Sequence, residues 1–240
     1  MVPGLLIFDF DGTLYRGDDP FRRYAEIISR SMTPDNAKVY LDHVQRHLDG
    51  EAGMVAGDNW EAVVGLAKRW LSDRERWQEA FLETRVFMMS DACQLEVPQD
   101  LVELLVYARG KVLLAVASNS PEAAAEPLLN KLGLFSYFDR VVSDAHKPDG
   151  LLTLVDQWLP SLDPGCIFSV GDNYANDIAP GLGRGWKTAH ISPHGHFPGP
   201  ADVRGRRLEE VLPTIRAWVD EVGRSDHVAA FQTKAVQSHG

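Results

Sequence analysis

An unbroken apolar run that leads directly into two acidic residues, LLIFDFDGT at residues 5–13, constrains the fold most. Four consecutive apolar residues ended by a glycine-containing turn are typical of a strand buried on both faces of a parallel sheet. Asp9 and Asp11 follow at its carboxyl end, where open α/β sheets bind ligands, and can face one cation. Gly12 allows the backbone to turn sharply. Aspartate and glycine are also ordinary turn residues, so this segment alone leaves a purely structural turn equally open.

The composition is that of an ordinary globular protein, with 240 residues of which 45% are hydrophobic and 24% charged. A net charge of −10 argues against nucleic acid or an anionic membrane as a partner. Cys93 and Cys166 match no metal or redox spacing, which predicts free thiols in a reducing compartment. No signal peptide is evident, and no apolar stretch approaches the ~20 residues that span a bilayer. We therefore expect a cytoplasmic monomer or small homo-oligomer.

After the first strand the pattern becomes helical for about eighty residues, with apolar residues on one face of successive segments. Thr33 before Pro34 predicts one helix start. The Asp58/Glu61 and Ser72/Glu75 pairs predict two more, because they resemble capping boxes. The sequence therefore predicts an all-helical unit over residues 15–95, inserted directly after the first strand.

From Pro98 onward apolar strands alternate with helices, the pattern of a doubly wound parallel sheet. The further strands are predicted at residues 112–117, 140–142, 167–170 and 188–191. The last helix is predicted over residues 208–222, and a polar, poorly ordered tail over 224–240. The predicted fold class is α/β, a Rossmann-like parallel sheet with helices on both faces, formed by residues 1–14 and 96–223.

Polar side chains follow the first four predicted strands: Asp9 and Asp11, then Ser118 and Asn119, then Lys147, and then Asp172. Because parallel strands all end at one edge of the sheet, these side chains can meet there. Three clustered carboxylates repel one another without a cation, and ligand sets made of oxygen favour Mg²⁺. A lysine and a hydroxyl beside them suit the oxygens of a phosphate group.

Four segments together resemble the haloacid dehalogenase superfamily, on its phosphatase side (subfamily I). They are DFDGT at 9–13, VASNS at 116–120, KP at 147–148 and GDNYANDI at 171–178, in the family's order and each after a predicted strand. Far more of the chain separates Asp11 from Ser118 than Ser118 from Lys147. This spacing places a helical cap of the C1 type between the first two strands.

The resemblance implies a catalytic role for four positions. Asp9 would be the nucleophile that forms an aspartyl-phosphate. Asp11 would be the general acid that protonates the leaving group and then the base that activates water. Ser118 and Lys147 would stabilise the transferring phosphoryl group. The predicted phosphate-binding residues are Gly12, Ser118, Asn119 and Lys147.

The resemblance also implies a magnesium site. Mg²⁺ would be held by the Asp9 carboxylate, the Asp11 backbone carbonyl and Asp172. Asp177 would lie outside this set of ligands and orient water or Lys147.

The leading hypothesis is a Mg²⁺-dependent phosphatase that hydrolyses a small-metabolite phosphomonoester. The alternative is a phosphomutase of the same superfamily, because mutases with this cap share the two-aspartate motif. A haloacid dehalogenase is disfavoured, since Asp11 supplies an acid that dehalogenases do not need. A non-catalytic binding protein is disfavoured because every predicted catalytic side chain is present. Sugar phosphates, phosphoglycolate and nucleoside monophosphates all stay open as substrates.

Further candidates for substrate contact are Arg16, Arg22, Arg23, Asn59 and Trp60. A solvated surface or packing within the cap explains these residues more simply. His43 and His47 lie one helical turn apart and could bind zinc, but no third ligand is evident. A solvated helix face is the favoured interpretation for both histidines.

Overall fold

The computed structural model describes residues 4–51 and 57–237. Within them a parallel sheet has the strand order β3-β2-β1-β4-β5-β6, the order of Rossmann-like folds. The strands are β1 (Leu5–Phe8), β2 (Leu113–Ala117), β3 (Arg140–Val142), β4 (Ile167–Gly171), β5 (Lys187–Ile191) and β6 (Val203–Gly205). Each neighbouring pair is parallel, so all the carboxyl ends share one edge. The predicted fold class is confirmed.

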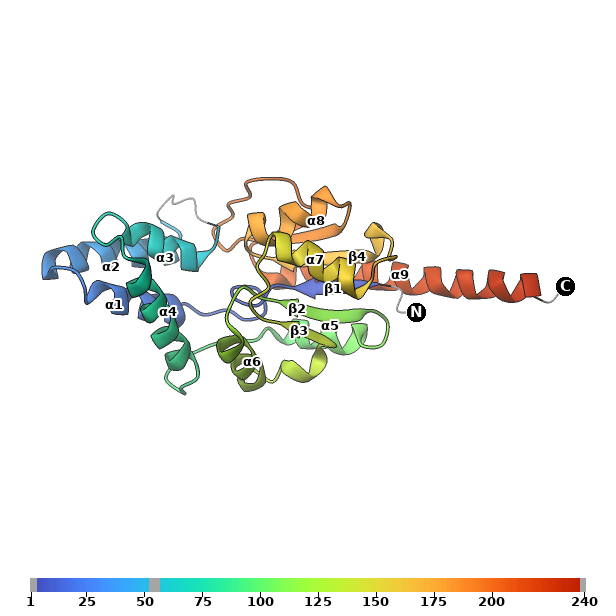
Figure 1. The fold of residues 1–240 in the computed structure, drawn as a ribbon, viewed down its shortest axis with the longest axis horizontal. Coiled ribbons are helices and arrows are strands. Elements are labelled where there is room, and N and C mark those ends of the chain that lie inside the picture. The colour runs from blue at the N-terminus through green and yellow to red at the C-terminus, as the bar shows by residue number, and fades with distance from the viewer. Residues whose placement is uncertain (1–3, 52–56, 238–240) are drawn as a thin grey trace.

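The central strand β1 is buried on both faces, as its unbroken apolar run predicts. Leu6 and Phe8 contribute to the core on one face, and Leu5 and Ile7 to the core on the other. One face is covered by α5 (Gln99–Ala108), α6 (Glu122–Lys131) and α9 (Leu208–Gln237). The other is covered by α7 (Asp149–Trp158) and the short α8 (Ala179–Gly183), as Figure 1 shows. The sheet is therefore the middle layer of three.

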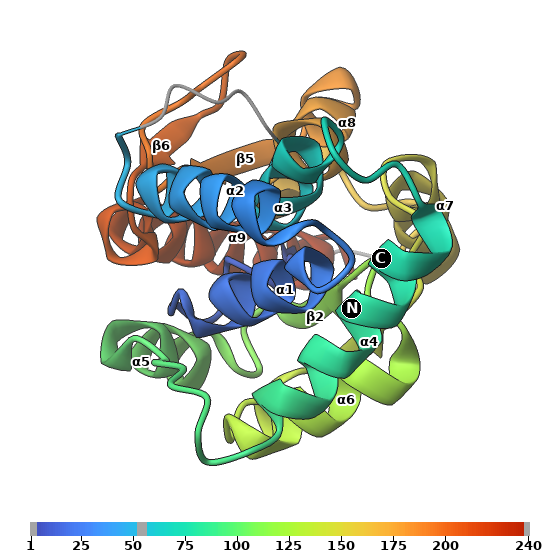
Figure 2. The same ribbon diagram turned by 90° about the vertical axis from the view of Figure 1, so that its left-hand side faces the viewer.

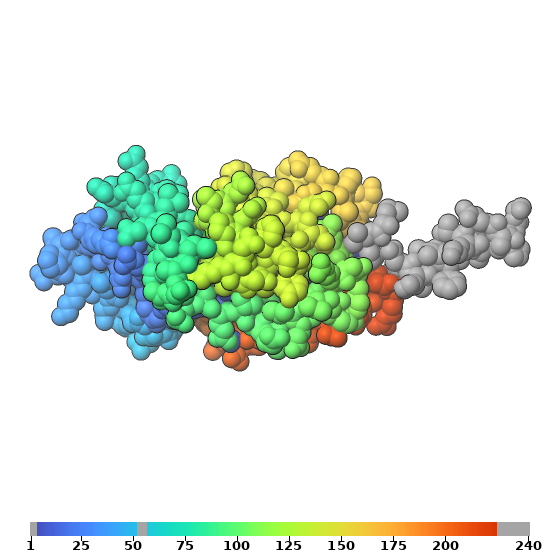
Figure 3. All heavy atoms as spheres, turned by 90° about the horizontal axis from the view of Figure 1, so that it is seen from below, coloured from blue at the N-terminus to red at the C-terminus, as the bar shows by residue number. Residues whose placement is uncertain are grey.

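The first four of the five helices described between β1 and β2, here called the cap helices, pack beyond the carboxyl ends of the strands (Figures 1 and 2). They are α1 (Asp19–Ser29), α2 (Pro34–Leu48), α3 (Asn59–Ala67) and α4 (Arg74–Met88). Their own apolar core includes Phe21, Tyr40 and Val63. Figure 3 shows them in contact with the rest of the molecule, and Lys131 Nζ of α6 donates to the Met88 carbonyl at 2.8 Å.

The two connections between the cap helices and the sheet run side by side. Arg16 and Glu96 form an antiparallel bridge, in which each backbone N–H donates to the other's carbonyl oxygen at 2.9 Å. The Arg16 side chain pairs with Glu96 and, at 2.6 Å, with Glu209. The entry and exit of the cap are therefore tied to each other at one point.

Three local predictions differ from the structure. The helix α4 is capped by Asp73, not Ser72, because the Asp73 carboxylate accepts the backbone N–H groups of Glu75 and Arg76. The strand β6 was missed because its three residues form no apolar run. The tail predicted over residues 224–240 is helical as far as 237, since no proline or glycine interrupts α9 after Gly223; residues 238–240 lie outside the described residues.

Among the described residues, no helix combines the length and the apolar character that crossing a membrane requires.

Candidate active site

The carboxyl edge of the sheet and the cap helices enclose a cleft of about 260 Å³. Its lining residues are Asp9, Asp11, Asp58, Trp60, Glu61, Phe81, Ser118, Asn119, Ser120, Lys147, Asp172, Asn173, Asn176 and Asp177. Gly12 lies at the same edge with a φ of +85°, and a Cβ on it would fall 2.2 Å from Asp172 Oδ2. Only glycine fits at that position. The predicted catalytic and metal-binding residues all lie together at this edge of the sheet.

Lys147 joins two of the carboxylates. Its Nζ lies 2.6 Å from Asp9 Oδ1 and 2.6 Å from Asp177 Oδ1. Burial disfavours the charged amine, but the two carboxylates outweigh this effect and raise the pKa of Lys147. The lysine therefore stays cationic inside the site.

Asn119 fixes the position of that lysine. The Lys147 N–H donates to Asn119 Oδ1 at 2.7 Å, and Asn119 Nδ2 donates to the Lys147 carbonyl at 3.2 Å. Both ends of the amide are thereby engaged with the backbone of Lys147. In this arrangement Asn119 orients Lys147, whereas the sequence analysis predicts that Asn119 binds the phosphate group.

Three carboxylates converge beside Lys147. Asp9, Asp172 and Asp177 each place an oxygen so that the three atoms lie within 4.8 Å of one another. Burial raises the pKa of all three carboxyl groups, that of Asp177 to about 7. Among the described residues, no donor pairs with the carboxylate of Asp172. A hard cation with oxygen ligands fits this set, because it would neutralise charge that one lysine leaves unbalanced.

The side chain of Asp11 meets a residue that the sequence did not single out, Arg85 of α4. Arg85 Nη1 lies 2.6 Å from Asp11 Oδ1, and its Nη2 donates to Asp11 Oδ2. The Tyr15 hydroxyl donates to Oδ1, and Ser120 Oγ donates to Oδ2 at 2.7 Å. Burial favours the neutral acid, but Arg85, Tyr15 and Ser120 together hold the pKa of Asp11 below its usual value.

One signal in the sequence could have identified Arg85. It lies on the buried stripe of α4, four residues after Phe81 and three before Met88. Its guanidinium carbon lies 4.8 Å from the Phe81 ring centroid and 5.1 Å from that of Trp60. A charged residue on an apolar helix face needs a buried partner, and that partner is the predicted general acid.

The candidate substrate contacts separate into two groups. Trp60 lines the cleft, and its neighbour Asn59 accepts a hydrogen bond from His47 Nε2 at 3.0 Å. The three arginines lie elsewhere: Arg16 at the bridge, Arg22 paired with Asp18 at 3.2 Å, and Arg23 paired with Glu83 at 3.1 Å. These arginines form ion pairs on the surface and line no part of the cleft.

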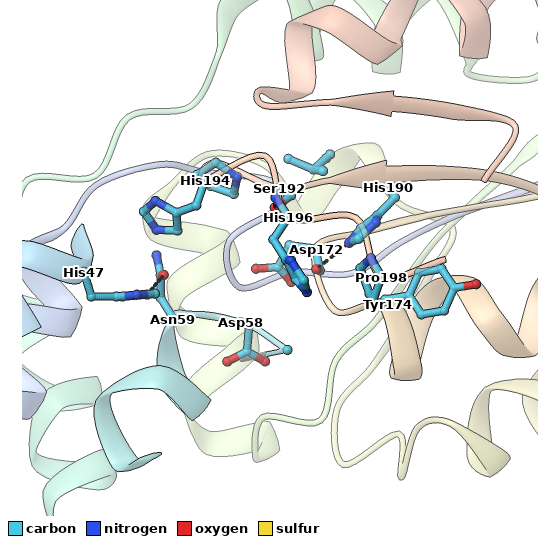
Figure 4. A pocket seen from close by; sticks show the side chains of 13 residues that line it. His47, Asp58, Asn59, Asp172, Tyr174, His190, Ser192, His194, His196 and Pro198 are labelled. Atoms are coloured by element: carbon cyan, nitrogen blue, oxygen red, sulfur yellow. Dashed lines mark hydrogen bonds between the residues drawn. The ribbon is translucent and has the colours of Figure 1, made fainter. Parts of the chain in front are cut away.

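A second cavity, of about 60 Å³, lies between the cap helices and the loop after β5 (Figure 4). His47 of α2 and His194 of that loop face each other there, with ring centroids 4.7 Å apart. His47 is only 4% exposed, so the prediction that it lies on a solvated helix face is wrong. His190 Nε2 donates to the Asp172 carbonyl at 3.1 Å and so holds the backbone of that carboxylate.

The cap also contacts the loop after β4. Asn173 Nδ2 donates to Asp58 Oδ2 at 3.0 Å and to Glu61 Oε1 at 3.2 Å. Burial raises the pKa of Asp58 to about 6, although the bond from Asn173 opposes this. The cap is thus docked by polar contacts next to the carboxylate cluster.

Comparison with known proteins identifies the family and the fold of this chain. A model of the haloacid dehalogenase-like hydrolases matches residues 4–183. No curated protein matches significantly. Among solved structures, YfnB of Bacillus subtilis, a provisionally assigned HAD-hydrolase bound to magnesium, is 18% identical, with a TM-score of 0.58 over 88% of this chain and 97% of that chain.

Two further solved structures share the fold. A predicted phosphoglycolate phosphatase of Haemophilus somnus is 18% identical, with a TM-score of 0.60 over 88% of this chain and 97% of that chain. A provisionally assigned β-phosphoglucomutase of Thermotoga maritima is 18% identical, with a TM-score of 0.58 over 89% and 99%. With the family model spanning most of its length, the chain belongs to the haloacid dehalogenase-like hydrolases.

Proposed function

We propose that the chain is a Mg²⁺-dependent phosphatase that hydrolyses a small-metabolite phosphomonoester through an aspartyl-phosphate. One observation carries the proposal. Asp9 Oδ1 lies 2.6 Å from Lys147 Nζ at the floor of the cleft, and the acid Asp11 lies two residues further along the same edge. A nucleophile, a fixed cation and a separate proton carrier are the parts that phosphoryl transfer to a carboxylate requires.

The residues divide the reaction into two steps. In the first, Asp11 takes up a proton from solvent once Arg85 no longer pairs with it. A carboxylate oxygen of Asp9 then forms a bond to phosphorus while the ester P–O bond breaks and Asp11 gives that proton to the leaving oxygen. In the second, Asp11 takes a proton from water as that water attacks phosphorus and releases Asp9. Ser118 Oγ accepts the Ser120 N–H at 3.0 Å, which leaves its own O–H to donate to a phosphoryl oxygen.

The metal would be held by the carboxylates of Asp9 and Asp172 and by the carbonyl of Asp11. When bound, it supplies positive charge that lets an anionic carboxylate approach an anionic phosphate. Asp177 is already engaged by Lys147 and, at 3.1 Å, by the Asn173 N–H. We place it outside the set of metal ligands, where it would position the lysine and add negative charge next to the cation.

We also propose that residues 15–95 act as a lid on a core formed by residues 1–14 and 96–223. The supporting observation is that Trp60, Glu61 and Phe81 line the cleft from the cap side. A closed lid excludes water from the phosphoryl group and contacts the leaving group, which determines specificity.

The first test is phosphate release from a panel of phosphomonoesters, with Mg²⁺ and with EDTA. Metal-dependent release, lost in Asp9→Asn with the fold intact, supports the proposal. Undiminished release by a clean Asp9→Asn preparation would falsify the mechanism.

The phosphomutase is a second candidate, because one structural neighbour carries that provisional assignment. If the chain is a phosphomutase, phosphate release should be low. A sugar phosphate should instead be isomerised, and this isomerisation should depend on added sugar bisphosphate. Both products are measured in the same samples.

A further inference from the structure

Arg85 is the cap residue most closely engaged with the catalytic edge. Its side chain is 4% exposed, yet it comes from α4, not from the sheet. Its guanidinium contacts Asp11 and Ser120 on the core side and the rings of Trp60 and Phe81 on the cap side. The Arg85 guanidinium therefore connects the cap residues that line the cleft to the proposed general acid.

In this arrangement, Asp11 has no oxygen left for a substrate. Its Oδ1 accepts from Tyr15 and Arg85, and its Oδ2 accepts from Arg85 and Ser120. Proton transfer to a leaving group requires the ester oxygen to come within hydrogen-bond reach of one of these oxygens. Arg85 must therefore release at least one oxygen of Asp11 before the chemistry proposed above can occur.

A displaced guanidinium needs a new partner. Arg85 stays charged, lies between two aromatic rings, and its Nε already has no hydrogen-bond partner among the described residues. Removing one member of a buried ion pair is strongly unfavourable, because it leaves the other charge uncompensated. A planar guanidinium matches a carboxylate or phosphate with two parallel hydrogen bonds.

We infer, on the basis of the proposed function, that Arg85 selects phosphomonoesters whose leaving group carries a second anionic group. That group takes the place of Asp11 as the partner of the guanidinium and frees Asp11 for the ester oxygen. Because the anion and the ester oxygen must both lie beside Asp11, only a few bonds separate them. The substrate class is therefore a short phosphorylated acid or a short bisphosphate.

The test compares esters that differ in this second charge. The neutral ester is 2-hydroxyethyl phosphate, and the two anionic esters are 2-phosphoglycolate and ethane-1,2-diol bisphosphate. The variants are Arg85→Gln and the control Arg76→Gln, an exposed arginine of the same helix paired with Glu79. We expect kcat/KM of the wild type to favour an anionic ester by about 10- to 150-fold, the range of a charged hydrogen bond. Arg85→Gln should lose this preference, and Arg76→Gln should keep it.

A purely structural role for Arg85 predicts a different pattern, in which all esters decline together and the preference stays. Equal kcat/KM for the acidic and neutral esters in the wild type overturns the inference while leaving the phosphatase intact. If Arg85→Gln does not fold, Arg85→Lys keeps the charge but lacks the two parallel donors of a guanidinium. In that variant the ratio of kcat/KM for the anionic ester to that for the neutral ester should fall toward one.

Binding separates this inference from the proposed function. Calorimetry with 3-phosphonopropionate and 3-hydroxypropylphosphonate requires no turnover. Tighter binding of the acid that depends on Arg85 supports the inference even if no ester is hydrolysed, whereas equal binding refutes it. The absence of phosphate release with every ester instead counts against the phosphatase.

Discussion

Removal of divalent metal should make the stability of this protein depend strongly on pH. Burial raises the pKa of Asp177 from 3.8 to about 7, and those of Asp9 and Asp172 are raised as well. In the metal-free protein the folded state therefore holds protons that the unfolded chain has already released. Its free energy of unfolding should fall as the pH rises from about 4 to about 7. For Asp177 alone, about three pKa units correspond to about 4 kcal/mol.

Urea unfolding, followed by the fluorescence of the six tryptophans, measures this effect between pH 5 and pH 8. Histidines such as His190, whose pKa burial lowers, change stability in the opposite direction over part of this range. The quantity to plot is therefore the difference between samples with Mg²⁺ and with EDTA at each pH, because histidine contributions cancel in it. That difference should grow with pH, and Asp172→Asn should reduce it. A difference that stays flat would refute the placement of a cation next to these three carboxylates.

Three further predictions concern the site. Asp9→Asn should lower phosphate release by roughly 10³-fold or more while the far-ultraviolet circular dichroism spectrum still shows a folded protein. Asn119→Ala removes both bonds to the backbone of Lys147 and should lower kcat by roughly 10- to 100-fold, with a loss of stability of about 1–3 kcal/mol. Steady-state kinetics and urea unfolding check the two effects. Gly12→Ala places a Cβ 2.2 Å from a carboxylate oxygen and should weaken Mg²⁺ binding in titrations, whereas Gly133→Ala, with φ +70° and no neighbour within 4 Å, should cost stability alone.

The sheet could be predicted because short stretches of the sequence are enough to identify its buried strands. The run at residues 5–8 is apolar at every position, and in the structure alternate residues contribute to two different cores. The polar residues after each strand then had to meet, since parallel strands end at one edge. The same reasoning placed Asp9, Lys147 and Asp172 together without any knowledge of distances.

Contacts between the cap and the sheet could not be predicted in this way. Arg85 and Asp11 are far apart in the sequence, and their pairing depends on how α4 docks against the core, which no periodicity encodes. His47 was assigned to a solvated face because the sequence shows no third zinc ligand. In the structure the loop carrying His194 covers His47. Both errors come from surfaces that are buried only when two separately patterned units meet.

The bridge between Arg16 and Glu96 has a mechanical consequence. Tyr15, which donates to Asp11, is the residue next to this bridge, and Arg85, which also donates to Asp11, is carried by the cap. A rotation of the cap about the bridge would withdraw Arg85 from the acid, whereas Tyr15, which is buried in the core beside the sheet, would stay in place. Entry of the substrate and release of the Asp11 carboxylate by Arg85 would then depend on the same rotation. The rate of that rotation would therefore set the upper limit on the turnover rate.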